Sequence, residues 1–372
     1  MAGGIVVPLL AACLTLACGH TEPATPPPYG SDTPFDPGPP QRLTYNAAAD
    51  RAAAWLADGS GLLYSAQQVA RPDRDVCLAL LPPTGGSQRG LWCDVPDGES
   101  QTDAVEFAAP DGAGRLAFFS ASGTIGGASP VRVAIALAPT LDPRNAARVR
   151  TFPYTPEGST PQDAAEHLRW LDGTRLAYVG QQFRVRVPCV LCPPDTLRIG
   201  QAVTVLETAA PGSLPAAVPG TAFATGVATE PGTDALYYTL GGDTRVYRRS
   251  LTSGSVDIVH DFGGAGIARD IHVAGGRLAA VVGGRVAFVT DAQFGPVQRD
   301  SGGVVHVVDL ASGQDTRLEP GARLFRRPAL SPAGDAVAVE GYPLILAPLG
   351  TVPPSVDTTV GKAGDLFLFG AP

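Results

Sequence analysis

Residues Pro328-Ala-Leu330-Ser-Pro-Ala-Gly334-Asp-Ala-Val-Ala-Val339 decide the fold. A short apolar run leads into a turn that contains Gly334 and an aspartate, and a second apolar run leaves it. Glycine tolerates the positive φ that tight hairpin turns demand, and runs rich in β-branched residues favour strands. The stretch therefore predicts a β-hairpin, and its nearly continuous apolar character predicts strands buried on both faces.

The same unit recurs along the chain. The other copies are Ala53–Tyr64, Val105–Phe119, Leu168–Tyr178, Gly226–Tyr238 and Ile271–Val281. Their turn glycines recur roughly every 43 to 61 residues, a period that suits one propeller blade. Third and fourth strands follow most hairpins, as at Arg245–Leu251 and Ser255–Val259, and no segment has a helical period. We predict an all-β fold, a single β-propeller of six blades with four antiparallel strands each.

Seven blades are the alternative, because residues 283–310 and 341–370 carry insertions long enough to hide a degenerate copy. The ends of the chain fit a closed ring. The last copy lacks one strand, and Gln41–Tyr45 is a strand-like run before the first copy. We expect this N-terminal strand to pair with the C-terminal blade and leave no exposed edge.

The repeat resembles that of TolB-type (WD-repeat-like) propellers. The similarity rests on the aromatic, Ser/Ala-Pro, Asp-Gly and apolar-strand unit and on a later Val-x-x-Val-Asp-Leu-x-x-Gly, here Val305 to Gly313. It extends over residues 41–372. Only the last copy keeps Ser331-Pro332, and the fourth and fifth lack the aromatic residue. Because the motif is structural, the resemblance implies the fold and leaves the function open.

The N-terminus resembles that of a bacterial lipoprotein. The apolar run Ile5–Ala17 has the length of a signal-peptide core and is too short to span a bilayer. It ends in Leu16-Ala-Cys18-Gly, which resembles a lipobox, although Thr15 stands where leucine is usual. The resemblance implies lipidation of Cys18, with Cys13 as second choice. An ordinary cleaved signal peptide is the alternative.

Residues 19–40 are proline-rich and polar, and such a segment buries too little apolar surface to fold. We therefore divide the chain into a signal peptide at 1–18, a disordered tether at 19–40 and the propeller at 41–372. This organisation predicts an exported, membrane-anchored lipoprotein, periplasmic or on the cell surface. Its membrane contact would be through the lipid anchor alone.

Four of the six cysteines lie beyond the signal region, at Cys77, Cys93, Cys189 and Cys192. An even number in an exported chain predicts disulfides. Cys77 and Cys93 occupy what should be neighbouring strands of the first blade, which favours a cross-strand bridge. The Cys189-x-x-Cys192 pair favours a local structural disulfide, with a redox pair or half of a zinc site as alternatives.

Polar residues on the innermost strands are candidates for the mouth of the central channel. They are Glu106, His167, Arg169, Asp270, His272 and Arg327. Solvation of the channel rim is the simpler interpretation. The alternative is a divalent-metal site, calcium above all, made by Glu106 and Asp270 beside His167 and His272.

The sequence contains no Gly-x-Ser-x-Gly, phosphate-loop or His-Glu-x-x-His motif. The net charge of −8 comes without any basic cluster, which argues against nucleic acid as a partner. We therefore expect a non-catalytic propeller without a cofactor that serves as a scaffold for an envelope protein or peptide. A metal-dependent hydrolase of the lactonase type, with its site in the channel, is the alternative.

Overall fold

The computed structural model describes residues 40–46, 48–68, 75–92, 101–124, 132–152, 162–186, 195–210, 213–230, 232–283, 286–291, 295–300, 303–318, 323–349, 355–360 and 364–370. They belong to one unit of the chain, Pro34–Pro372. Outside them lie the predicted lipidation sites Cys18 and Cys13, the predicted signal peptide and nearly all of the predicted tether. Cys93, Cys189 and Cys192 lie outside them as well.

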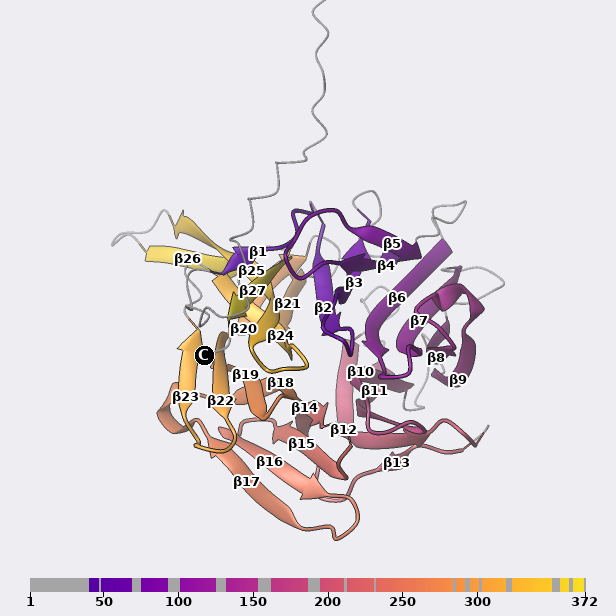
Figure 1. The fold of residues 1–372 in the computed structure, drawn as a ribbon. Helices are drawn as coiled ribbons and strands as arrows, with labels where there is room; N and C mark the ends of the chain where they lie inside the picture. The colour runs from indigo at the N-terminus through magenta and orange to yellow at the C-terminus, as the bar shows by residue number, and fades with distance from the viewer. Residues whose placement is uncertain are drawn as a thin grey trace, which may run out of the picture. The chain divides into compact units, whose positions relative to one another are not determined.

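Strands make up almost all of the regular structure, which confirms the all-β prediction (Figure 1). Within the described ranges the only helical elements are two 3-10 turns, η1 (Pro143–Asn145) and η2 (Gly263–Ala265). No helix in this part of the chain is long and apolar enough to cross a membrane.

The strands form antiparallel sheets of the kind expected for propeller blades. Three sheets have four strands each. The first consists of β10 (Gln162–Trp170), β11 (Arg175–Arg186), β12 (Asp195–Glu207) and β13 (Ala216–Ala217), and the second of β14 (Ala224–Thr229), β15 (Ala235–Leu240), β16 (Arg245–Ser250) and β17 (Val256–Asp261). The third consists of β18 (Ala268–Ala274), β19 (Arg277–Val282), β22 (Val304–Asp309) and β23 (Asp315–Leu318). A fourth has the order β24 (Arg323–Leu330), β25 (Ala336–Leu349), β27 (Asp365–Gly370) and β1 (Gln41–Arg42), with β26 (Ser355–Val360) paired to β25.

The first part of the chain forms one eight-stranded sheet. It contains β2 (Asp50–Trp55), β3 (Leu62–Gln67), β4 (Asp75–Leu81), β5 (Arg89–Trp92), β6 (Gln101–Pro110), β7 (Leu116–Thr124), β8 (Arg132–Ala138) and β9 (Ala147–Phe152). A short hairpin of β20 (Val286–Asp291) and β21 (Gly295–Asp300) is a sheet by itself.

The ring closes as predicted. Strand β1 pairs antiparallel with β27, with Gln41 opposite Leu368 and Arg42 opposite Phe367. The N-terminal and C-terminal strands thus complete one blade together, and the chain has a β-propeller fold with four-stranded antiparallel blades.

The innermost strands surround the axis of the ring. Contacts run from β2 to β6, β10, β14, β18 and β24 in turn, and β24 contacts β2. Five clusters of buried side chains each join strands of neighbouring sheets, and a sixth packs the two halves of the eight-stranded sheet together. We call the face of the ring on which these innermost strands begin the leading face, and the opposite one the trailing face.

The repeat units of the sequence correspond to pairs of strands. The first unit forms the hairpin β2–β3, and its turn residue Gly59 has φ 73°. In the last unit Gly334 has φ 76°, and a Cβ there would lie 3.0 Å from the carbonyl oxygens of Ala274 and Gly275 in the preceding blade. Glycine is therefore required at Gly334 for its backbone conformation and for close packing.

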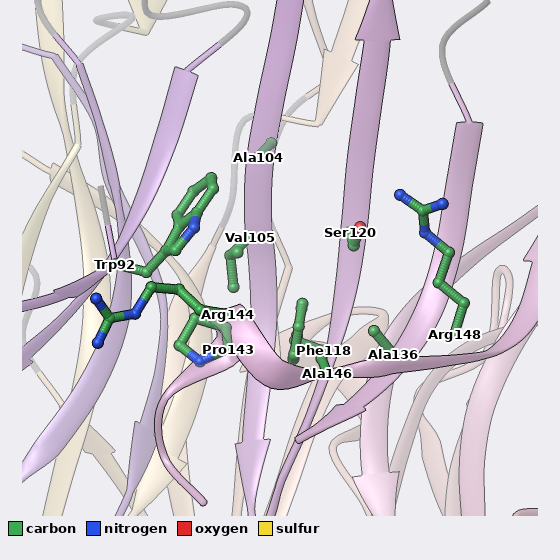
Figure 2. A pocket seen from close by; sticks show the side chains of 10 residues that line it. All are labelled: Trp92, Ala104, Val105, Phe118, Ser120, Ala136, Pro143, Arg144, Ala146 and Arg148. Atoms are coloured by element: carbon green, nitrogen blue, oxygen red, sulfur yellow. The ribbon is translucent and has the colours of Figure 1, made fainter. Parts of the chain in front are cut away.

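A pocket opens at the outer edge of the core between β2–β5 and β6–β9. Its volume is about 490 Å³. The floor belongs to a buried cluster that includes Val105, Phe118 and Ala136, and Trp92 packs against that cluster from β5 (Figure 2).

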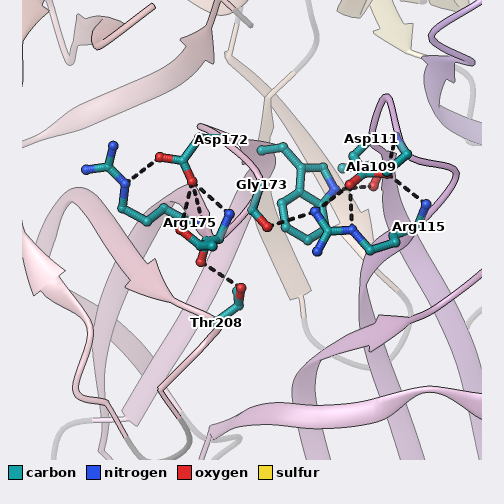
Figure 3. A network of polar contacts seen from close by, with 10 residues as sticks. Ala109, Asp111, Arg115, Asp172, Gly173, Arg175 and Thr208 are labelled. Atoms are coloured by element: carbon teal, nitrogen blue, oxygen red, sulfur yellow. Dashed lines mark hydrogen bonds and ion pairs between the residues drawn. The ribbon is translucent and has the colours of Figure 1, made fainter. Parts of the chain in front are cut away.

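Tryptophans at the ends of two innermost strands connect neighbouring blades. The indole of Trp170 donates to the Ala109 carbonyl at 2.9 Å, and that of Trp55 donates to Ala329 at 2.8 Å. Arg115 Cζ lies 4.7 Å from the ring centroid of Trp170. Figure 3 shows Arg115 with Asp111 and Gly173. Arg115 also donates to Gly173 O at 2.8 Å. The aromatic residues of the repeat therefore act as inter-blade braces.

Candidate functional site

Each innermost strand carries an irregularity near the axis. The pairing register shifts between Arg51 and Ala54, Glu106 and Ala109, Glu166 and Arg169, Ala224 and Gly226, Arg269 and His272, and Arg326 and Ala329. In five strands the first residue of this bulge has positive φ; these residues are Ala52, Phe107, His167, Asp270 and Arg327. Such a conformation costs about 1–2 kcal/mol for a residue with a Cβ. Its recurrence in five innermost strands calls for compensating contacts.

Those contacts are made across the axis. We call Phe107, His167, Asp270, Arg327 and Glu340 the axial cluster. His167 Nε2 lies 3.2 Å from Asp270 Oδ1, and both side chains are only 6% exposed. The backbone N–H of Arg327 donates to Asp270 Oδ2 at 3.3 Å, and its guanidinium lies 4.9 Å from the Phe107 ring centroid. The left-handed residues of four blades thus meet in the middle of the ring.

Glu340 on β25 completes the axial cluster. It is fully buried. Arg327 Nη1 donates to both of its carboxylate oxygens, at 3.1 and 2.9 Å. The backbone N–H of Ala52 and the hydroxyl of Tyr342 donate to it as well, at 2.5 and 3.1 Å. A buried carboxylate with four such bonds is well compensated for its loss of hydration.

The charges in this cluster set the protonation of their neighbours. Burial raises the pKa of Asp270, but the hydrogen bond and charge of His167 and the charges of Arg326 and Arg327 lower it well below its usual value. Burial and the Arg169 charge lower the pKa of His272 to about 3. His272 is therefore neutral at physiological pH. Its Nδ1 accepts the Leu330 N–H at 3.2 Å, so its proton is on Nε2.

Arg169 lies in the same environment. Burial lowers its pKa to about 10; Asp270 acts in the opposite direction, and Arg327 adds to the lowering. The side chain is therefore still a cation at neutral pH, and its Nη1 donates to the Leu168 carbonyl at 2.9 Å.

The structure brings together three of the six predicted residues, His167, Asp270 and Arg327, by direct contact. Arg169 lies close enough to Asp270 and Arg327 for their charges to shift its pKa, and the Arg169 charge in turn lowers the pKa of His272. Glu106 instead pairs with Arg51 at 2.9 Å, in a half-buried position outside the axial cluster.

The predicted metal group is not assembled. Of its two carboxylates, Asp270 lies 4.0 Å from Arg326 Nε and Glu106 pairs with Arg51. In the described ranges no three His, Cys, Asp or Glu side chains are arranged to hold a metal ion.

The sequence interpretation missed Glu340, Phe107 and Ala52 as axial residues. The available signal for Glu340 was a carboxylate directly after the apolar run Ala336–Val339. Phe107 occupies the bulge of β6, three residues before the position that corresponds to Trp55 on β2 and Trp170 on β10.

The cysteine prediction is resolved for one residue. Cys77 on β4 is buried and disulfide-bonded, and its partner lies outside the described residues. The pairing of Cys77 with Cys93, and the disulfide between Cys189 and Cys192, remain predictions.

The leading face carries two exposed apolar side chains on neighbouring blades. Phe223 directly precedes β14 and is 69% exposed, and Ile267 directly precedes β18 and is 45% exposed. Phe223 also has φ 65°, rare for a bulky residue. Its N–H donates to Gln201 O at 2.7 Å and its carbonyl accepts from Gly241 N at 2.8 Å, so the backbone is held in this strained state.

No protein-family model and no curated protein matches the chain. Among solved structures, a gluconolactonase from Xanthomonas campestris matches with a TM-score of 0.51 and 17% identity, over 93% of this chain and 99% of that one. TolB from Acinetobacter baumannii matches with a TM-score of 0.47 and 14% identity over 84% of this chain, which spans 64% of TolB. The WD40 repeats of RRP9 match at 0.45 and 13%, over 91% and 99%. What these similarities share is the propeller fold.

Proposed function

We propose that this protein is an exported, lipid-anchored scaffold whose propeller binds a protein or peptide of the cell envelope and catalyses no reaction. The observation that carries the proposal is the pairing of the axial groups with one another. Asp270 lies beside the Arg326 guanidinium, Glu340 pairs with Arg327, and His272 is neutral with its Nδ1 already bonded. Because these groups bind one another, they stabilise the ring, and we assign recognition of the partner to the surface loops.

The same proposal assigns six blades to the ring. Among the residues that the structure describes, the two halves of the eight-stranded sheet, β2–β5 and β6–β9, are paired only over a short parallel stretch, Asp75 with Asp103 and Val76 with Ala104. We therefore count them as two blades. The insertions that left seven blades open contain the hairpin β20–β21 and the extension β25–β26, which do not supply four strands around the axis.

We place the partner on the leading face. Exposed aromatic and aliphatic anchors carry much of the energy of protein interfaces, and strained exposed residues concentrate at functional sites. Phe223 meets both conditions, and Ile267 extends the apolar surface onto the next blade. A partner with an apolar side chain for this patch would bind there.

Site-specific photocrosslinking in the native envelope tests this placement. We expect a photoreactive side chain at Phe223 or Ile267 to link to the same protein. One at Leu214, which is 82% exposed in the loop toward the trailing face, should not. The purified partner should then bind the Phe223→Ser variant at least about tenfold more weakly. Equal crosslinking from Leu214, or unchanged affinity of the variant, would overturn the placement.

A metal assay separates this proposal from the hydrolase alternative. The purified full chain should contain no stoichiometric calcium or zinc after dialysis without chelator. One tightly bound ion per chain, lost in an Asp270→Asn variant that still folds, would sink the scaffold proposal and favour the enzyme. The proposed anchor is tested separately, since labelling with a radioactive fatty acid should disappear in Cys18→Ser and persist in Cys13→Ser.

A further inference from the structure

The pocket between β5 and β6–β8 combines an apolar interior with a cationic rim. Its interior is lined by the side chains of Val105, Phe118 and Ala136, all buried, and the half-buried Trp92 forms one wall. At about 490 Å³ it is within the range of sites for small organic ligands. The flat indole and phenyl groups favour a flat apolar ligand body.

Two arginines stand at the rim. Figure 2 shows Trp92 and Arg144 on one side of the pocket and Arg148 on the other. None of the ten lining residues is acidic, although the chain as a whole has a net charge of −8. The pocket is thus locally complementary to an anion.

Arg144 is held in place by its neighbour Asp142. Its Nε donates to Asp142 Oδ1 at 2.9 Å, and its Nη2 donates to Oδ2 at 2.5 Å. These hydrogen bonds, followed by the Arg144 charge, lower the pKa of Asp142 to about 2, so the carboxylate stays ionised. Among the described residues Nη1 of Arg144 has no recorded partner, and its two N–H groups are available to a ligand oxygen.

We propose that this pocket binds a small aromatic carboxylate, with its ring between Trp92 and Phe118 and its carboxylate toward Nη1 of Arg144. The apolar interior supplies contact area, and the Arg144 guanidinium discriminates the anion from a neutral compound of the same shape. The site is separate from the axial cluster and from the Phe223–Ile267 patch, so it does not depend on the proposed scaffold function.

Titration of the full chain with naphthalene-2-carboxylate tests the site, with naphthalene-2-carboxamide as the neutral control. Binding changes tryptophan emission through Trp92, because Trp55 and Trp170 are bonded between blades; Trp92→Phe should remove the signal. The carboxylate should bind roughly tenfold more tightly than the amide. Arg144→Gln should abolish that preference, and Arg317→Gln on β23 should retain it.

Ser120→Leu provides a steric test, since Ser120 lines the pocket from β7. The substitution should weaken the binding of both compounds equally while leaving the melting temperature of the protein nearly unchanged. Equal affinity for the two compounds, a preference that survives Arg144→Gln, or no binding of the carboxylate at about 1 mM would overturn the proposal.

Discussion

Two buried aspartates on innermost strands have pKa values displaced in opposite directions. Asp270, 5% exposed, belongs to the axial cluster and has cationic neighbours that lower its pKa. Asp50, 2% exposed, lies at the seam where β1 closes the ring, and burial raises its pKa to about 6.

The partners explain the difference. At the seam, Asn46 Nδ2 donates to Asp50 Oδ1 at 2.9 Å, while the nearby carboxylate of Asp365 raises the pKa further. Arg42 pairs with Asp365 at 2.5 Å and has only a weak effect on Asp50. Burial to the same depth therefore favours the ionised form on the axis and the neutral form at the seam, because only the axis supplies direct cationic partners.

The largest expected effect is at Glu340. The Glu340→Ala variant leaves Arg327 without its carboxylate and the Ala52 N–H without an acceptor, so we expect a loss of about 3–5 kcal/mol in the free energy of unfolding. Urea denaturation at pH 7 measures it. Glu340→Gln keeps an acceptor for Ala52 and should lose less. An alanine variant as stable as the original chain would show that the axial contacts contribute nothing.

Asp270→Asn should lower stability by about 3 kcal/mol at pH 7, because it removes the charge opposite His167, Arg326 and Arg327. The folded pKa of Asp270 lies below its unfolded value, so its contribution exists above pH 4 and is lost as the pH falls. Acid titration of stability should therefore show a shallower decline below pH 4 in the variant. Parallel curves for the two proteins would contradict the depressed pKa.

Asp50→Asn should have the opposite sign. The folded pKa lies above the unfolded value, so the contribution of Asp50 is present below about pH 4 and lost as the pH rises to about 6. At 1.36 kcal/mol per pKa unit, the variant should be more stable by about 3 kcal/mol at pH 8 and unchanged at pH 3. A variant destabilised at pH 8 would refute the raised pKa and end the comparison.

The smallest effect is expected from Asp365→Asn. Removing this carboxylate should lower the Asp50 pKa, because the Asp365 charge raises it. The change should be small, because burial raises the pKa more than this charge does. Stability should change by less than about 1 kcal/mol, because Arg42 is 38% exposed and surface ion pairs contribute little. The measurement is the pH above which the Asp50→Asn variant becomes more stable than the protein with Asp50. It is made once in the original chain and once in a chain that carries Asp365→Asn. A pH unchanged by the second substitution would rule out the coupling.

Much of the fold could be predicted from the sequence, because turns and apolar strands depend on residues close together in the chain. The hairpin at Ala53–Tyr64 and the closing strand at Gln41 were predicted and are present. The axial cluster was only half predicted. Polar residues such as His167 and Asp270 stood out on innermost strands, but Glu340 depends on Ala52, 288 residues away. The bulge that directs Phe107 inward depends on strand register, which a repeat alignment does not contain.

The contacts across the axis should make this ring unfold differently from a linear array of repeats. In a linear repeat array each unit touches only its neighbours, so units can melt one after another. Here His167 and Asp270 join β10 to β18 past the intervening β14, and Arg327 and Phe107 join β24 to β6 past β2. Losing any one of these blades releases a partner two positions away, which should make melting a concerted event with a single sharp transition.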